Sequence, residues 1–184
     1  MQAKHSKAQA ENSWVRQAHA PIVSPNTFSA QAVQLKHCVG VHVDGSPSCI
    51  GVAIRDYRGS LFAASSKILP APFSVEITEA LALQEGVLLA LDLGISHAIV
   101  ESDALSIIQA ITEGDLGGDL GHIVQNIKDI SSSFSWCSFQ HLKRSGNRAT
   151  HELARAARIS GVSWVWEGVC PSFVEHIIIE DSGG

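Results

Sequence analysis

The sequence is poor in charge and in cysteine, and it has no long apolar run. Charged residues make up 17% of the 184 positions and apolar residues 45%, which excludes wholesale disorder and is enough for one full core. The four cysteines form no Cys-x-x-Cys pair, so they predict no zinc site. Because the N-terminus lacks a secretory signal, we expect reduced thiols. No apolar run reaches the ~18 residues that cross a bilayer. We therefore expect a soluble intracellular protein, nuclear or cytoplasmic, with no membrane partner.

Acidic residues outnumber basic ones. The formal net charge of -5 excludes a generally basic nucleic-acid binder, although it allows a local basic patch. Residues 1–36 are polar and aperiodic, and they predict a disordered extension. An organelle transit peptide is the alternative for this segment, but its single arginine, Arg16, supports that weakly. We expect one domain over residues 37–181, a tail at 182–184, and a monomer as the default.

Three strands are predicted at the start of the domain. Alternating valines at positions 39, 41 and 43 indicate a half-buried strand, and residues 50–54 indicate a second strand that returns beside it. After a turn at 56–59, residues 60–67 suggest a third strand of an antiparallel meander. Asp44 lies at the tip of the first hairpin. Because strand interiors disfavour aspartate, either an Asp-Gly turn or a ligand must explain it.

A long helix is predicted from Val75 to about Leu93, with Ser74 as its cap and Gly94 as its stop. Its apolar residues form two stripes on nearly opposite sides: Ile77, Leu81, Leu88 and Leu91, and then Glu79, Ala82, Gly86, Ala90 and Leu93. Because Glu79 begins the second, small-residue stripe, we expect it to lie against the sheet. The helix dipole favours an acid in the first turn, which explains Glu76 better than Glu79.

The chain then continues as strand, helix, helix and strand. Residues 97–101 predict a buried strand and residues 104–112 a helix, which implies a parallel strand added through a right-handed crossover. Asp103 lies at the carboxyl end of this strand, where open α/β sheets bind ligands. An equally good explanation from the residues alone is that Ser102 or Asp103 caps the helix. Residues 123–130 predict another helix, and residues 134–142 the last strand.

The final helix begins near Asn147, which can cap it. Its apolar side carries small residues and Leu153, and its other side carries His151. A basic cluster occupies the preceding loop and the same polar side: Lys143, Arg144, Arg148, Arg155 and Arg158. This cluster is either a solvated face or, beside a metal site, a phosphate-binding ridge that includes Asn147. We expect the aromatic residues of the segment 161–184 to pack back onto the domain.

The predicted topology brings three carboxylates together: Asp44, Glu79 and Asp103. Like charges in a partly buried site repel one another unless a cation neutralises them. Oxygen ligands of this kind select Mg²⁺ or Mn²⁺, and two such ions about 4 Å apart are a recurring device for phosphodiester cleavage. One ion would activate a water, and the other would stabilise the leaving oxygen.

The order βββαβαβα and four motifs together resemble the ribonuclease H fold. The motifs are Val-Asp-Gly-Ser at 43–46, Thr-Glu-Ala-Leu at 78–81, Glu-Ser-Asp-Ala at 101–104 and Asn-Arg-Ala-Thr-His-Glu-Leu-Ala at 147–154. The resemblance implies an α/β fold with a mixed five-stranded sheet, three strands antiparallel and two parallel, flanked by helices. More closely, residues 38–181 resemble the plant reverse-transcriptase-like ribonuclease H domains of non-LTR retrotransposons, and the segments 51–59 and 166–181 fit that group too.

The resemblance implies that Asp44 bridges two metal ions, that Glu79 contributes to the leaving-side ion, and that Asp103 holds the nucleophile-side ion. It also implies an RNA-DNA hybrid as the substrate, with the 2′-hydroxyl groups distinguishing RNA from DNA. The sequence departs from active members of the family at two places. The fourth carboxylate of the family falls at His151, and residues 143–146 replace the Gly-His pair of the preceding loop.

Both departures bear on mechanism. A neutral imidazole suits Mg²⁺ poorly and Mn²⁺ better, so the second ion should be held more weakly. Without the loop histidine, which would ordinarily assist product release, turnover should be slow. Alternatively, His151 is a solvated helix residue among arginines. Three hypotheses follow: a metal-dependent hybrid endoribonuclease, a nucleic-acid-binding module with little or no catalysis, and a protein-interaction scaffold. The three retained acids favour the first hypothesis over the third.

Overall fold

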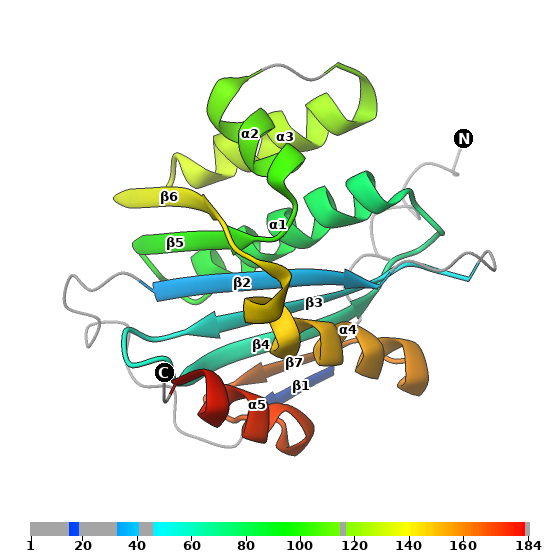
Figure 1. The fold of residues 1–184 in the computed structure, drawn as a ribbon, viewed down its shortest axis with the longest axis vertical. Coiled ribbons are helices and arrows are strands. Elements are labelled where there is room, and N and C mark those ends of the chain that lie inside the picture. The colour runs from blue at the N-terminus through cyan, green and yellow to red at the C-terminus, as the bar shows by residue number, and fades with distance from the viewer. Residues whose placement is uncertain (1–14, 19–32, 41–45, 115–116, 183–184) are drawn as a thin grey trace, which may run out of the picture.

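The computed structural model describes residues 15–18, 33–40, 46–114 and 117–182. Its strands are β1 (Val15–Ala18), β2 (Val33–Gly40), β3 (Cys49–Arg55), β4 (Leu61–Ile68), β5 (His97–Ser102), β6 (Trp136–His141) and β7 (Trp164–Glu167). Its helices are α1 (Val75–Asp92), α2 (Leu105–Glu113), α3 (Gly118–Ser131), the 3₁₀ turn η2 (Arg144–Asn147), α4 (Arg148–Ser160) and α5 (Ser172–Ser182). The strands form one sheet in the order β1-β7-β4-β3-β2-β5-β6 (Figure 1).

Strands β2 to β6 confirm the predicted five-stranded sheet. Strand β3 pairs antiparallel with both β2 and β4, whereas β5 lies parallel to β2 and β6 parallel to β5. The crossovers between the parallel strands run through helices, as this arrangement requires. Two short strands that the sequence analysis missed extend the sheet beyond β4. Strand β7 pairs antiparallel with β4, and β1 pairs parallel with β7.

The N-terminal part of the chain departs from the predictions. Gly40, the last described residue of β2, pairs with Cys49. The predicted strand residues Val41 and Val43, and Asp44 with them, lie outside the described residues, so that part of the prediction is not tested. Strand β1 and the first residues of β2 fall within residues 1–36, for which no regular structure was predicted. The edge of β7 explains β1, because an unpaired strand edge offers backbone donors and acceptors that a further segment can satisfy. The domain boundaries at 37 and 181 stay a prediction.

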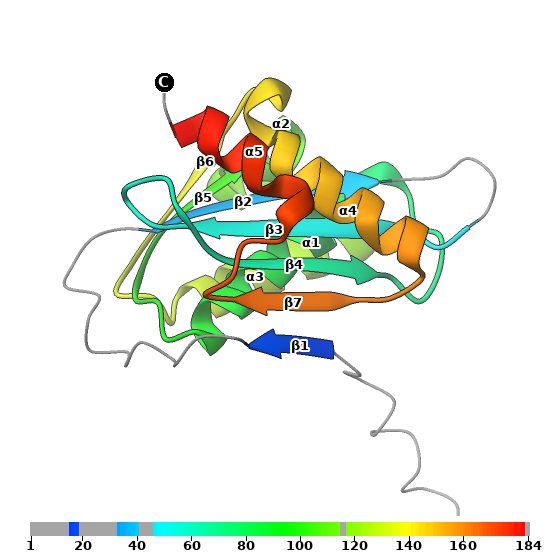
Figure 2. The same ribbon diagram turned by 90° about the horizontal axis from the view of Figure 1, so that it is seen from below.

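Side chains of β3 alternate between two layers of helices, which cover opposite faces of the sheet (Figure 2). Val52 and Ile54 join the large apolar cluster on the side of α1, α2 and α3. Ala53 instead packs with Leu153 of α4 and Trp166 of β7. Trp166 is buried and stacks on Trp164, which confirms that the C-terminal aromatics pack onto the domain. In the part of the chain that is described, no helix is long and apolar enough to cross a membrane.

Helix α1 begins and ends close to the predicted residues. The Ser74 hydroxyl accepts a hydrogen bond from the Ile77 amide at 3.3 Å, as an N-cap should. The small-residue stripe is buried as predicted, because Ala82, Gly86 and Ala90 all lie against neighbouring elements. The other predicted stripe was wrong in part. Leu88 is 37% exposed, and the core takes Ala80, Leu83 and Val87 instead, because α3 packs on α1 in addition to the sheet.

Candidate active site

Helix α1 carries Glu79 on the side that faces the sheet, where the carboxylate is half-buried. Burial is the main cause that raises the pKa of Glu79, and the negative charges of Asp103 and Glu76 raise it further. The positive charge of Arg144 opposes these effects. The negative charge of Asp103 therefore acts against ionisation of Glu79, and a cation that joins the two carboxylates stays a prediction.

Asp103 follows β5 directly and is held by a side chain from another element. The Asn147 amide Nδ2 donates a hydrogen bond to Asp103 Oδ1 at 2.9 Å. Neither Ser102 nor Asp103 occupies the N-cap position of α2. That position is held by Ala104, and no side chain makes a capping hydrogen bond there. The Ser102 Oγ atom accepts a hydrogen bond from the Ala104 amide instead. The capping alternative for Asp103 is therefore excluded.

Asn147 corrects two predictions. It occupies the N-cap position of α4, but its side chain makes no capping hydrogen bond because the amide is directed at Asp103. It is also only 1% exposed, which places it beneath the surface that a nucleic acid could reach. The backbone carbonyl oxygen of Asn147 accepts a hydrogen bond from Thr150 Oγ1 at 2.7 Å, which stabilises the first turn of α4. Asn147 thus positions a carboxylate rather than contacting a ligand itself.

His151 and Arg144 complete the group of charged residues. Burial is the main cause that lowers the pKa of His151, the positive charge of Arg144 lowers it further, and Asp103 and Glu152 oppose this shift. The shift favours the neutral form of the imidazole. Asp103 is one of the groups that influence the pKa of His151, and the role of His151 as a fourth ligand, which the family resemblance implies, stays a prediction. A neutral ring supplies a nitrogen donor and no negative charge.

Gly51 of β3 sets how closely α4 approaches the sheet. A Cβ atom at this position would lie 2.7 Å from the Ala154 amide nitrogen and closer still to the Thr150 carbonyl oxygen. No other residue fits, because both contacts are with helix backbone that cannot rotate away. The sequence analysis did not single out Gly51, although a glycine inside a strand is a signal for close backbone approach. This contact fixes the level of His151 above the sheet.

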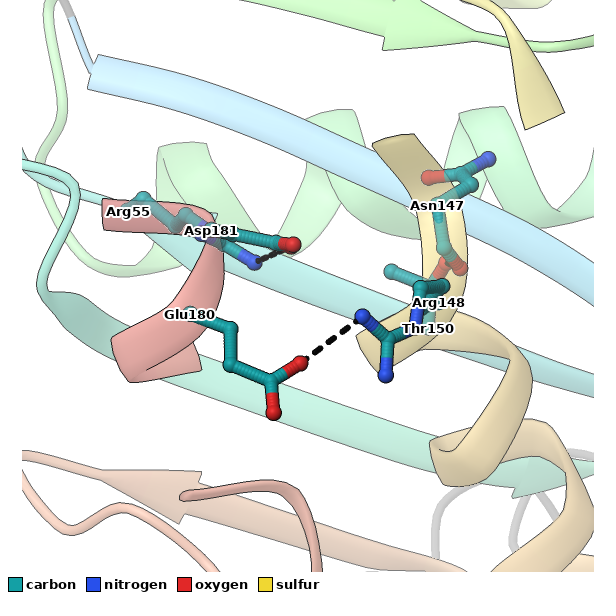
Figure 3. Close-up of polar contacts among 6 residues, drawn as sticks. All are labelled: Arg55, Asn147, Arg148, Thr150, Glu180 and Asp181. Atoms are coloured by element: carbon teal, nitrogen blue, oxygen red, sulfur yellow. Dashed lines mark hydrogen bonds and ion pairs between the residues drawn. The ribbon is translucent and has the colours of Figure 1, made fainter. Parts of the chain in front are cut away.

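The same face of the sheet holds α5 through a buried ion pair. Arg55, at the end of β3, is 2% exposed and its Nη2 atom lies 2.8 Å from Asp181 Oδ2 (Figure 3). The Nε atom of Arg55 is buried without a hydrogen-bond partner among the described residues. Glu180, the preceding residue of α5, reaches Arg148 of α4 at 2.9 Å (Figure 3). Helices α4 and α5 are therefore tied both to the sheet and to each other.

All five side chains of the basic cluster are exposed. Exposure agrees with both predicted alternatives, a solvated face and a phosphate-binding ridge. The side chains in question are those of Lys143, Arg144, Arg148, Arg155 and Arg158. Two of them already have acidic partners, since Arg148 pairs with Glu180 and Arg155 pairs with Glu152 at 3.1 Å. Exposed ion pairs of this kind contribute little stability, so a phosphate can compete for the same guanidinium groups.

The donor set near β5 suits a hard cation in part. Glu79 and Asp103 supply carboxylate oxygens, the preferred ligands of Mg²⁺ and Mn²⁺. Within the described residues, however, no group of three or more His, Cys, Asp or Glu side chains could hold a metal ion. Asp44, the third predicted ligand, lies outside them. Among the described residues, Glu79 and Asp103 therefore influence one another, whereas the complete ligand set of Asp44, Glu79, Asp103 and His151 stays a prediction.

Sequence comparison assigns the chain to a family. The profile of the family described as "Reverse transcriptase-like" matches residues 38–157. The chain belongs to the reverse transcriptase-like family. The match covers every element from the end of β2 to α4, and therefore all of the candidate site residues except Arg158. No curated protein matches this reverse transcriptase-like chain significantly in sequence.

Solved structures confirm the ribonuclease H fold of this reverse transcriptase-like domain. Ribonuclease H1 from Halobacterium salinarum is 18% identical, with a TM-score of 0.65 over 70% of this chain and 98% of its own. LC11 ribonuclease H1, solved in complex with an RNA/DNA hybrid, is 19% identical, with a TM-score of 0.64 over 70% of this chain and 98% of its own. The N-terminal ribonuclease H domain of a Mycobacterium tuberculosis protein is 18% identical, with a TM-score of 0.65 over 71% of this chain and 96% of that chain. At these identities the likeness concerns the fold alone.

Proposed function

We propose that this reverse transcriptase-like domain is a metal-dependent endoribonuclease that hydrolyses the RNA strand of RNA-DNA hybrids. The observation that carries the proposal is the pairing of Glu79 with Asp103. Burial and the negative charge of Asp103 both raise the pKa of Glu79. Keeping both carboxylates ionised therefore costs free energy unless a cation is bound between them. Asn147 adds to this, because a buried amide that orients a carboxylate is typical of the support around metal ligands.

In this proposal Glu79, Asp103 and Asp44 hold the cation, which is Mg²⁺ or Mn²⁺, and His151 assists as a fourth ligand. Bound divalent cations supply charge stabilisation for phosphodiester hydrolysis. The chain itself orients the ligands: Asn147 fixes Asp103, and Gly51 allows α4 to bring His151 close. The exposed cations Lys143, Arg144, Arg148, Arg155 and Arg158 attract the phosphate backbone. An RNA-DNA hybrid as the partner, and an origin in a plant non-LTR retrotransposon, follow from the family resemblance.

His151 supports a second candidate, a nucleic-acid-binding module with little or no catalysis. Its ring is neutral and adds no negative charge to the cation site. Replacing it by the family's acid separates the two candidates. If the neutral ring limits cation binding, His151→Asp should raise Mg²⁺-dependent cleavage by about tenfold and reduce any preference for Mn²⁺. A catalytically decayed module would gain nothing from this substitution.

The test is cleavage of a labelled RNA-DNA hybrid by the full chain, with Mg²⁺ and Mn²⁺ titrated separately. We expect cleavage by the wild type and a loss of roughly two orders of magnitude in Asp103→Asn and in Asp44→Asn, with hybrid binding largely retained. Activity that survives both substitutions would come from a contaminant and would overturn the proposal. Binding without cleavage at any metal concentration would favour the second candidate.

A further inference from the structure

A pocket of about 340 Å³ lies between α4 and α5, beside the candidate active site. Its lining combines one guanidinium, two imidazoles, one carboxylate and an aromatic ring: Arg148, His151, Glu152, Phe173, His176 and Ile177. Helix α4 supplies the first three of these residues and α5 the last three. Ligand pockets begin at roughly 300 Å³, so this pocket has room for one small unit such as a nucleotide rather than for several.

His151 connects the pocket to the candidate site. It lines the pocket from the first turn of α4, the turn that begins at Asn147, and the Asn147 amide donates a hydrogen bond to Asp103. A molecule bound between α4 and α5 therefore contacts Arg148, the residue that follows Asn147, and Asn147 holds Asp103. The pocket is accordingly placed to bind a neighbouring part of the same nucleic acid rather than an unrelated ligand.

The aromatic side of the pocket is formed by Phe173. This ring is 39% exposed although it packs edge-on against Trp166, with 6.0 Å between the ring centroids and an angle of 70° between their planes. The contact with Trp166 holds the ring in one orientation while part of it stays open to solvent. A fixed, partly exposed ring is what an unpaired base requires for stacking.

The polar side of the pocket supplies donors for a phosphate. Arg148 keeps donors beyond the Nη1 atom that contacts Glu180, and that ion pair is exposed on both sides, at 50% and 57%. A phosphate can displace Glu180 because such pairs contribute little. His176 adds an exposed imidazole from α5. The acidic Glu152 is paired with Arg155, which offsets its charge toward an anion.

We propose that the pocket between α4 and α5 binds one single-stranded nucleotide that extends from the nucleic acid in the candidate site. The phosphate contacts Arg148 and His176, and the base stacks on Phe173. The nucleotide is unpaired, because a base inside a duplex is already stacked between its neighbours. This proposal rests on the proposed function for the identity of the ligand, but its test does not depend on cleavage.

The first experiment measures the affinity of a fluorescently labelled RNA trinucleotide for the full chain carrying Asp103→Asn, which cannot cut it. We expect Phe173→Leu and His176→Gln each to weaken binding by about tenfold. Glu180→Gln should tighten binding a few-fold by releasing Arg148. The matched controls are Ile179→Ala, an exposed apolar residue of α5 outside the pocket, and His122→Gln, an exposed histidine of α3. Both controls should bind as the parent does.

The variants must keep the fold for this comparison to hold, so each is checked by thermal melting. Phe173→Leu preserves apolar contact with Trp166 while removing the ring. The proposal is overturned if the parent does not bind the trinucleotide, or if the pocket variants bind it as tightly as the controls do. A uniform loss across pocket variants and controls would also overturn it, because the binding would not be located at the pocket.

The second experiment separates this proposal from the proposed function. A blunt RNA-DNA hybrid is compared with a hybrid carrying a single-stranded RNA overhang, in binding and in cleavage. We expect tighter binding of the overhang substrate, and Phe173→Leu should abolish that preference. If the preference is found without cleavage, the pocket proposal stands and the nuclease proposal fails. If blunt and overhang hybrids are bound and cut equally, the pocket proposal alone fails.

Discussion

On one face of the sheet, α1, α2 and α3 pack through one large cluster of buried apolar side chains, whereas on the other face α4 and α5 pack through two smaller apolar clusters and a few specific contacts. Those contacts include the close approach at Gly51 and the ion pair between Arg55 and Asp181. On the face of α1, α2 and α3, a small change in one side chain should have a limited effect on packing, because the packing energy is the sum of many weak contacts. The second face depends on particular atoms, and it is the face that positions Asn147, His151 and the pocket.

Two leucines offer a matched test of this difference. Leu83 of α1 and Leu153 of α4 are both fully buried, one on each face of the sheet. Truncating either to alanine should lower the free energy of unfolding by about 3 kcal/mol, because each leaves a cavity. Only Leu153→Ala should also reduce hybrid cleavage at a temperature where both variants remain folded. Denaturant unfolding and cleavage rates check this, and equal losses of activity would remove the distinction between the faces.

Asp181→Ala should destabilise the protein by about 3 kcal/mol, because it leaves the buried Arg55 guanidinium without its counter-charge. Asp181 is itself 17% exposed, so some water screening keeps the loss at the lower end of the range for buried pairs. Restoring a neutral pair with Arg55→Met and Asp181→Leu should recover most of the stability. Urea unfolding of the single and double variants measures this. A double variant no more stable than Asp181→Ala would show that the charge is not the cause.

Gly51→Ala should cost about 2 kcal/mol of stability, because the added methyl group forces α4 away from β3. It should also reduce hybrid cleavage by about tenfold or more, since displacing a catalytic constellation by about 1 Å has large effects. Ala53→Gly, two residues along on the same face, is the control, because it removes atoms instead of adding them. The assay is cleavage normalised to the folded fraction. Full activity in Gly51→Ala would show that the level of α4 does not matter.

Glu79→Gln should give the smallest effect, a slight gain in stability. Because burial and the Asp103 charge raise the pKa of Glu79, the folded chain binds a proton that the unfolded chain has released above about pH 4.3. The free energy of unfolding therefore falls as the pH rises from the ordinary pKa of a glutamate to the raised pKa of Glu79 in the folded chain. The gain from Glu79→Gln should be present at pH 7 and vanish below about pH 4. Thermal melts across this range, with and without Mg²⁺, test it, and Mg²⁺ should stabilise the wild type more than the variant.

Much of the fold could be predicted from periodicity and capping. Ser74 precedes an amphipathic run, and the alternation in β3 separates the two faces, so both elements follow from local chemistry. Strands β1 and β7 could not be predicted, because each has four residues and pairs only through distant parts of the chain. Helix α5 was not predicted, because its apolar residues do not follow a clear helical spacing.

Residues of the candidate site could be predicted only where both their side-chain chemistry and their position in the predicted topology pointed to the same site. Glu79 and Asp103 could be placed together because one begins a buried stripe and the other ends a parallel strand. The role of Asn147 could not be predicted, because an asparagine before a helix is explained equally well as a cap. Its bond to Asp103 spans 44 residues of sequence and depends on how α4 docks. Gly51 carried a signal in the sequence, but the partner it meets lies about a hundred residues further along the chain.

The measurement that tests the central claim most directly is a Mn²⁺ titration of the ¹⁵N-labelled chain, followed by paramagnetic broadening of amide resonances. A cation shared by Glu79 and Asp103 should first broaden the resonances of Thr78, Ala104 and Asn147, and Asp103→Asn should abolish this selectivity. Asp129, an exposed acid of α3, provides the reference for weak surface binding. Broadening at Asp129 that equals broadening at Ala104, or a pattern unchanged by Asp103→Asn, would contradict a cation site between Glu79 and Asp103.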